Sequence, residues 1–162
     1  MADEILPRLW IGDINSAHDL TFLKENGINC IINCTTSLPF SKHPSQKHRL
    51  SIKDNLQPEE IEKMFQSLDR AADLIHRYRT TMHVLVHCHM GKQRSVSVVL
   101  GYLIKYGKMT LKESVGYLLT KRQCALTPGF NFIEALRKYE AQIVPKSLPR
   151  REASVWLSKP RN

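Results

Sequence analysis

The chain has 162 residues, 42% of them hydrophobic and 24% charged, which is the size and composition of one globular domain and excludes a multidomain arrangement within these residues. It contains no apolar run near the roughly 18 residues that cross a bilayer, so we expect no transmembrane segment. The formal net charge of +9 favours anionic partners such as phosphoproteins, nucleic acid or acidic lipid, without choosing among them.

The N-terminal residues 1–7 carry two acidic side chains and lack a basic segment followed by an apolar stretch. We therefore expect no secretory signal and an intracellular location, cytoplasmic, nuclear or both. In a reducing compartment cysteines remain thiols, so each one is weighed as a core residue, a ligand or a nucleophile. The four are Cys30, Cys34, Cys88 and Cys124.

Clusters of Val, Ile and Leu bounded by turn residues predict strands. These are expected at Leu9–Ile11, Ile28–Cys34, Arg49–Ile52 and His83–His87. The polar, Pro-containing residues 35–48 between two of them predict a long surface loop.

Five helices are predicted from capping residues and from apolar positions that recur every three or four residues. The first runs from an N-cap at Ser16 to about Asn26, the second begins at Pro58, the third spans Ser95 to Tyr106, the fourth starts with a capping box of Thr110 and Glu113, and the fifth runs from Pro128 to near Ala141.

Strands that alternate with helices predict an α/β fold with a central, mostly parallel twisted sheet of about five strands and helices on both faces. In such folds binding sites collect beyond the carboxyl ends of the strands. We expect residues 1–144 to form the domain and the basic, Pro-containing residues 145–162 to form a flexible tail.

The segment around Cys88 is the strongest candidate for chemistry. A short turn from Cys88 to Arg94 joins a predicted strand to a predicted helix, which aims several backbone N–H groups and a helix N-terminus at one point. The turn is long enough to surround a tetrahedral phosphate, and Arg94 can close the ring with two parallel N–H bonds. This positive field favours the thiolate form of Cys88, which makes it a nucleophile. The predicted phosphate-binding residues are His89, Met90, Gly91, Lys92, Gln93 and Arg94.

The run from His87 to Ser95 resembles the His-Cys-x-x-Gly-x-x-Arg-Ser/Thr motif of cysteine-based protein tyrosine phosphatases. The stretches 6–12, 27–33 and 127–132 resemble the compact dual-specificity branch of that superfamily, and the resemblance covers roughly residues 3–144. It implies a protein tyrosine phosphatase-like fold, a phosphorylated protein substrate, hydrolysis of phosphotyrosine and phosphoserine or phosphothreonine, and neither metal nor cofactor.

The resemblance also implies roles for single residues. Asp54 is the expected general acid and base, and Ser95 is expected to donate a hydrogen bond to the Cys88 sulfur when that sulfur is the leaving group. We expect His87 to form a hydrogen bond near the loop and to help tune the reactivity of Cys88. Cys34, at the end of a neighbouring strand, is a possible redox partner of Cys88, because some superfamily members form such a disulfide.

The motif departs from the family at several positions, where Ala is common at Met90, Ser at Gln93 and Asn at Gly129. Met90 and Gln93 are expected to contribute mainly backbone amides, and the absence of Asn at Gly129 is expected to loosen the scaffold under the loop.

Three other functions remain open on this scaffold. Basic residues in the loop, His89 and Lys92, resemble those of phosphoinositide phosphatases, so acidic lipid is an alternative substrate. RNA 5′-phosphatases share the spacing of Cys and Arg, and a phosphate-binding module without catalysis is the third alternative. The sequence does not determine the oligomeric state.

Overall fold

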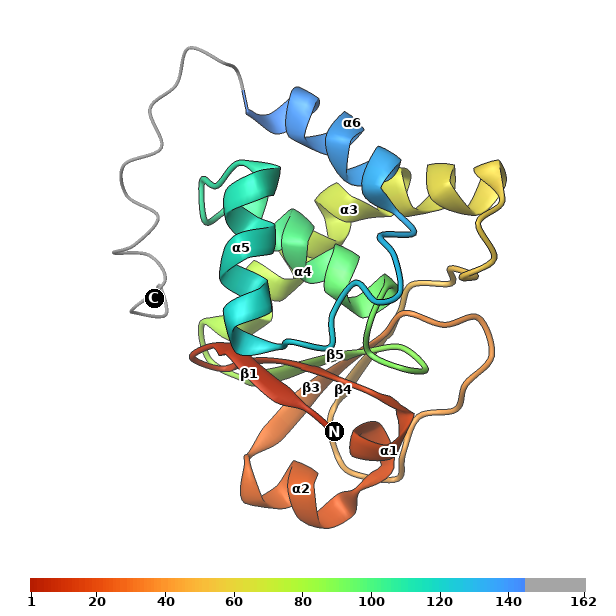
Figure 1. Cartoon of the computed structure of the whole chain (residues 1–162). Coiled ribbons are helices and arrows are strands. Elements are labelled where there is room, and N and C mark those ends of the chain that lie inside the picture. Colours follow the sequence, from red (N-terminus) through yellow and green to blue (C-terminus); the bar gives the residue numbers. More distant parts are fainter. Residues whose placement is uncertain (145–162) are drawn as a thin grey trace.

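The computed structural model describes residues 1–144, and the predictions made for residues 145–162 lie outside this part. A five-stranded sheet forms the centre, in the order β1-β2-β5-β3-β4. Three of its strand pairs are parallel and only β1 and β2 pair antiparallel, which confirms the mostly parallel sheet (Figure 1). The strands are β1 (Asp3–Leu6), β2 (Leu9–Gly12), β3 (Ile28–Asn33), β4 (Gln46–Arg49) and β5 (His83–His87).

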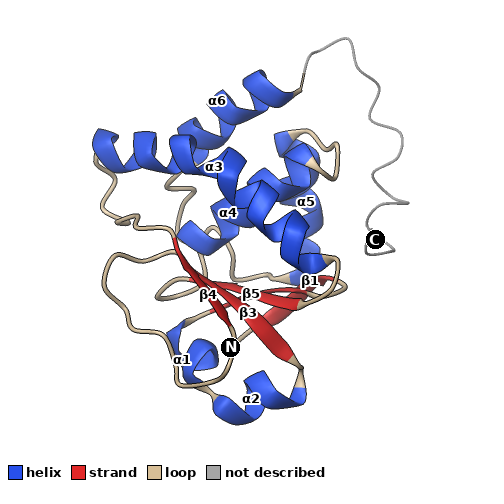
Figure 2. Cartoon of the chain, turned by 180° about the vertical axis from the view of Figure 1, so that it is seen from behind, coloured by secondary structure: helices blue, strands red, loops and turns tan. Residues whose placement is uncertain are grey.

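Helices cover both faces of the sheet, as predicted (Figure 2). On one side lie α1 (Ile14–His18) and α2 (Leu20–Glu25); on the other lie α3 (Pro58–Arg79), α4 (Arg94–Lys105), α5 (Leu111–Lys121) and α6 (Ile133–Ile143).

The central strand β5 shows how side chains are divided between the two faces. Val84 and Val86 belong to the large core under α3 to α6, whereas Leu85 belongs to the small core under α1 and α2. Side chains of a strand alternate between faces, so a strand covered on both sides is apolar throughout. In the strand order β5 is the third of five, so its carboxyl end lies at the middle of the sheet edge.

One predicted strand was misplaced and one strand was missed. The strand expected at Arg49–Ile52 lies at Gln46–Arg49 instead, so that its first three residues fall in the segment that was predicted to be loop. This strand lies at the edge of the sheet and pairs only with β3. An edge strand is open on one side, so it can consist of polar residues. Leu50 and Ile52 follow the strand and are buried. Their hydrophobic character therefore indicated burial and not hydrogen bonding to a neighbouring strand. The edge strand β1, with its acidic first half, was not predicted at all.

Two helix predictions also need correction. The helix expected from Ser16 to Asn26 is divided in two, because Asp13 caps α1 and Asp19 caps α2, while Ser16 lies inside α1. The last helix begins at Ile133 rather than Pro128, since the preceding residues form a turn. The second helix does begin at Pro58, and the capping box of Thr110 and Glu113 is confirmed.

Candidate active site

The Cys88–Arg94 loop leaves the central strand β5 and enters α4, at the carboxyl edge of the sheet. Its turn requires Gly91, which has a φ of 68°. A Cβ at this position would lie 2.6 Å from the carbonyl oxygen of Gly12 and 2.6 Å from the Arg122 guanidinium. Only glycine meets both requirements, because it has no Cβ and adopts positive φ freely.

The carbonyl groups of this loop are bound from outside it. The His87 ring bonds the carbonyl oxygen of Cys88, and the backbone N–H groups of Ile14 and Leu126 donate to the carbonyls of His89 and Lys92. In a trans peptide the carbonyl and the following N–H point in opposite directions. The N–H groups that follow these carbonyls therefore point to the other side of the loop, as an anion site requires.

A small pocket of about 170 Å³ lies on that side. Most of the predicted site residues line it, namely Asp54, Cys88, His89, Met90, Lys92, Gln93 and Arg94. Three lining residues were not predicted, namely Thr127, Pro128 and Asn131. Gly91 is the predicted loop residue that does not line it. The structure thus brings together the nucleophile, acid and guanidinium positions named from the sequence.

Cys88 and Ser95 face each other within the loop. The Cys88 Sγ and the Ser95 Oγ are 3.2 Å apart, and both residues are buried. Ser95 lies in the first turn of α4, so the hydroxyl that contacts the sulfur is carried by the N-terminal end of this helix. A hydroxyl at this distance can donate a hydrogen bond to a thiolate.

Arg94 joins the loop to the segment that carries Asp54. Its Nη1 donates to the carbonyl oxygen of Ile52 over 3.0 Å. Its Nε is buried and has no hydrogen-bond partner within residues 1–144. Since a buried donor without a partner is costly, this nitrogen is suited to bind an oxyanion beside Cys88.

Asp54 is exposed and lies in the loop of residues 52–57, which precedes α3. One of its carboxylate oxygens, Oδ1, accepts a hydrogen bond of 2.8 Å from the side-chain amide of Asn131. The carboxylate is therefore fixed at the pocket wall through one oxygen, and the other oxygen is not engaged by this contact.

His87 is buried behind the loop, with 1% of its surface exposed. Burial lowers its pKa from 6.5 to about 4, so the ring is neutral near pH 7. The ring Nδ1 lies 3.1 Å from the carbonyl oxygen of Cys88, which can only accept, so Nδ1 carries the proton and donates it. His87 therefore supports the backbone of the loop rather than adding a charge to it.

Cys34 follows β3 at the same edge of the sheet. Its backbone N–H donates to the carbonyl of His87 over 2.8 Å, and Asn33 pairs with His87, so Cys34 lies beside Cys88 in register. Neighbouring strands are about 4.8 Å apart, which is within the Cα separations of disulfides. Burial raises the pKa of the Cys34 thiol, and the nearby Cys88 raises it further.

The prediction for Gln93 was wrong, since its side chain does more than its backbone amide. Its Nε2 donates to the carbonyl oxygens of Gly129 at 2.6 Å and Thr127 at 3.3 Å, and its Oε1 accepts the N–H of Asn131 at 3.0 Å. The turn expected to be loosened at Gly129 is thus bonded directly to the Cys88–Arg94 loop. The signal in the sequence was that a long amide side chain, Gln93, stands where the family commonly has the short Ser.

Sequence reasoning also missed Arg122, which is 2% exposed. Its Nε donates to the carbonyl of Gly91 at 2.8 Å, and its Nη1 pairs with Asp3 at 2.7 Å. The guanidinium therefore holds a fourth carbonyl of the loop from outside, in addition to those of Cys88, His89 and Lys92. No local pattern marks it, because a single basic residue after a helix is ordinarily solvated.

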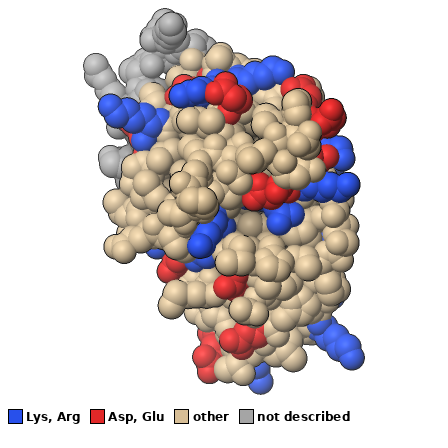
Figure 3. Space-filling model, turned by 45° about the vertical axis from the view of Figure 1, so that its right-hand side comes forward, with Lys and Arg blue, Asp and Glu red and all other residues tan. Residues whose placement is uncertain are grey.

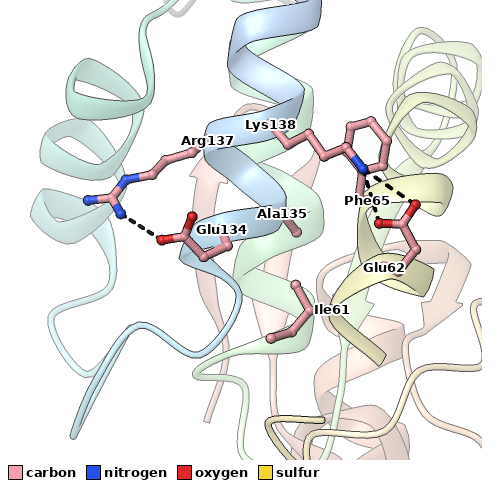
Figure 4. A pocket seen from close by; sticks show the side chains of 7 residues that line it. All are labelled: Ile61, Glu62, Phe65, Glu134, Ala135, Arg137 and Lys138. Carbon is pink, nitrogen blue, oxygen red and sulfur yellow. Dashed lines mark hydrogen bonds and ion pairs between the residues drawn. The ribbon is translucent and has the colours of Figure 1, made fainter. Parts of the chain in front are cut away.

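A larger hollow of about 440 Å³ lies between α3 and α6 (Figure 4). Ile61, Phe65 and Ala135 are its apolar members, and its charged side chains pair with one another, Glu62 with Lys138 and Glu134 with Arg137. It contains no nucleophile and no unpaired cation among its lining residues. The predicted nucleophile, Cys88, lines the smaller pocket instead.

Within residues 1–144 no group of three or more His, Cys, Asp or Glu side chains is arranged to hold a metal ion. In the same part of the chain, no helix combines the length and the apolar character that a membrane crossing requires.

Comparisons with known proteins agree with the resemblance seen in the sequence. Residues 9–142 match the family model described as dual specificity phosphatase, catalytic domain. The chain is 30% identical over 142 residues to human dual specificity protein phosphatase 16, covering 86% of this chain and 21% of that protein. It is 31% identical over 142 residues to mouse dual specificity protein phosphatase 2, covering 87% and 43%. The chain thus spans less than half the length of either relative.

Solved structures share the fold. Human DUSP28 superposes with a TM-score of 0.78 at 20% identity, covering 89% of this chain and 95% of that one. A human tyrosine phosphatase-like serine/threonine/tyrosine-interacting protein gives a TM-score of 0.74 at 26% identity, covering 89% and 98%.

Proposed function

The chain belongs to the dual specificity phosphatase family, and from this premise we propose that it hydrolyses phosphotyrosine and phosphoserine or phosphothreonine in proteins through a cysteinyl-phosphate intermediate. The observation that carries the proposal is the Cys88–Arg94 loop, whose carbonyls are bound from outside while its N–H groups and the free Nε of Arg94 remain for an oxyanion beside the sulfur.

In the first step the Cys88 thiolate attacks phosphorus, and the bond from phosphorus to the serine, threonine or tyrosine oxygen breaks. Asp54 gives its proton to the departing oxygen. The loop N–H groups and Arg94 stabilise the charge on the transferring phosphoryl oxygens.

In the second step water attacks the phosphorus of the cysteinyl-phosphate. Asp54, now a carboxylate, takes a proton from that water, and the bond from sulfur to phosphorus breaks. The electron pair returns to the Cys88 sulfur, where the Ser95 hydroxyl at 3.2 Å stabilises the thiolate by a hydrogen bond.

We infer the substrate class from the family and from the small site. The pocket of about 170 Å³, with the exposed Asp54 in its lining, supports a site that accepts phosphoserine and phosphothreonine as well as phosphotyrosine. A thiol nucleophile must stay reduced, which supports an intracellular location, cytoplasmic or nuclear.

Acidic lipid is the second candidate substrate, because His89 and Lys92 both line the pocket and add positive charge beside Arg94. RNA is less favoured. On the face shown in Figure 3, Lys and Arg alternate with Asp and Glu, and +4 of the net charge lies in residues 145–162. A continuous basic stripe is the usual footprint of a nucleic-acid interface.

One panel of substrates tests the proposal: p-nitrophenyl phosphate, a doubly phosphorylated peptide, a phosphoinositide and a 5′-triphosphorylated RNA, with Cys88→Ser as control. We expect phosphopeptide turnover that is unaffected by a metal chelator and lost in Cys88→Ser. Turnover that survives Cys88→Ser contradicts the mechanism, and phosphopeptide binding without turnover indicates a binding module.

A further inference from the structure

The loop of residues 52–57 is bonded to three other elements through three consecutive residues. The carbonyl of Ile52 accepts from Arg94 at 3.0 Å, the N–H of Lys53 donates to Glu60 of α3 at 2.8 Å, and the carboxylate of Asp54 accepts from Asn131 at 2.8 Å. Two of these contacts hold backbone. Only the contact from Asn131 holds the carboxyl group itself.

Asn131 is in turn held by the loop that carries the nucleophile. Its backbone N–H donates to the Oε1 of Gln93 at 3.0 Å, while the Nε2 of Gln93 donates to the carbonyl of Gly129 at 2.6 Å. Gln93 lies one residue before Arg94 and is buried. Two amide side chains therefore connect the Cys88–Arg94 loop with the carboxylate of Asp54, across a separation of 77 residues between Asn131 and Asp54.

From this connection we propose that Asn131 is a positioning residue, which is held by Gln93 and fixes the Asp54 carboxylate beside the pocket before substrate binds. The proposal rests on the proposed function, in which Asp54 protonates the leaving group. Because an amide N–H only donates, the contact occupies Oδ1 and leaves Oδ2 to carry the transferred proton.

The proposal predicts a selective defect. Asn131→Ala removes the amide but keeps the backbone N–H that Gln93 binds. Serine and threonine alkoxides are poor leaving groups that need the proton, so we expect kcat on a phosphoserine peptide to fall by about 10-fold to 100-fold. An aryl phosphate with an acidic leaving group needs no proton, so its kcat should change by less than about 3-fold.

Asn55→Ala is the matched control. Asn55 lies in the same loop, and its side chain accepts the N–H of Gln57 at 3.1 Å. We expect this variant to keep the wild-type ratio of phosphopeptide to aryl phosphate rates. Equal shifts in both variants overturn the proposal, because they show that any loosening of the loop is sufficient.

Two further variants separate positioning from folding and from substrate binding. Asn131→Leu has a similar volume and no donor, so it should reproduce the selective loss if Asn131→Ala does not fold. In the background of Asp54→Asn, Asn131→Ala should have no further effect on phosphopeptide kcat, because its target is already removed. Additive losses, or a rise in KM on both substrates with kcat unchanged, overturn the proposal.

Wild type and Cys88→Ser are measured beside these variants. Absence of Cys88-dependent turnover in wild type refutes the proposed function. Cys88-dependent turnover with an unchanged rate ratio in Asn131→Ala refutes only the positioning role.

Discussion

The buried, neutral His87 makes the stability of this protein depend on pH in a way that one substitution can isolate. Burial lowers the pKa of His87 from 6.5 to about 4 in the folded chain. The unfolded chain exposes the ring and restores the ordinary value. Between these two values the unfolded state binds a proton that the folded state does not, so the free energy of unfolding decreases as the pH falls.

The size of this effect follows from the shift. One pKa unit corresponds to 1.36 kcal/mol, so a change from 6.5 to about 4 corresponds to about 3 kcal/mol. This contribution is fully present above about pH 6.5 and is lost as the pH falls to about 4. It is a large part of the 5–15 kcal/mol that stabilises a typical domain.

Urea denaturation of wild type and His87→Asn across this pH range measures the contribution. The Nδ2 of asparagine can occupy the place of the ring Nδ1 and donate to the carbonyl of Cys88, but it does not titrate. Carboxylates contribute to acid sensitivity in both proteins and cancel in the difference. We expect wild type to lose about 3 kcal/mol more than His87→Asn between about pH 7 and pH 4. Parallel curves refute the reasoning.

Two other substitutions test the support of the Cys88–Arg94 loop, and one treatment tests the pairing of Cys88 with Cys34. Gly91→Ala should weaken inhibition by orthovanadate more than about 10-fold, because its Cβ would lie 2.6 Å from the Gly12 carbonyl at a φ of 68°; unchanged inhibition argues against this role. Arg122→Met should lower the free energy of unfolding in urea by about 2 kcal/mol, since it leaves the carbonyl of Gly91 without its buried donor and the partly exposed Asp3 without its ion pair, and a loss below about 1 kcal/mol contradicts this. Peroxide should oxidise Cys88 to a sulfenic acid that condenses with the Cys34 thiol, releasing water and forming a disulfide. Peptide mass mapping detects this disulfide in wild type and not in Cys34→Ser, and its absence from wild type refutes the redox partnership.

The loop between Cys88 and Arg94 could be predicted because its information is local. A strand, a turn of fixed length and a helix start follow each other directly, and this order alone predicts that backbone N–H groups of the turn converge. The capping box at Thr110 is local in the same sense, since the two residues of the box bond each other. The general acid at Asp54 came from the resemblance, not from spacing.

What the sequence did not reveal is which polar side chains far apart in the chain bond each other. Asn131 and Asp54 are 77 residues apart, and Arg122 and Asp3 are 119 apart, so no periodicity relates them. The edge strand β4 was misplaced for a related reason. Hydrophobicity reports whether a residue is buried, whereas a strand is defined by backbone pairing, and β4 pairs through polar residues while the buried Leu50 follows it.

The changes at Gln93 and Gly129 illustrate how two departures from a family pattern can be one feature. The family commonly has a short Ser at the first position and an Asn at the second. Here the long side chain of Gln93 reaches across and bonds the carbonyl of Gly129 at 2.6 Å, so the backbone of the turn is held without an Asn. Gln93→Ser should therefore lower the free energy of unfolding by about 2 kcal/mol, because it leaves partly buried backbone groups without partners.

Gly129→Asn should recover part of that loss in the double variant. No atom lies within 4 Å of a Cβ built at Gly129, so a side chain can begin there without displacing a neighbour. We expect a coupling free energy of at least about 0.5 kcal/mol between the two substitutions, measured by urea denaturation of the four proteins in the cycle. Strict additivity would contradict the compensation, since two changes that serve one contact cannot act independently.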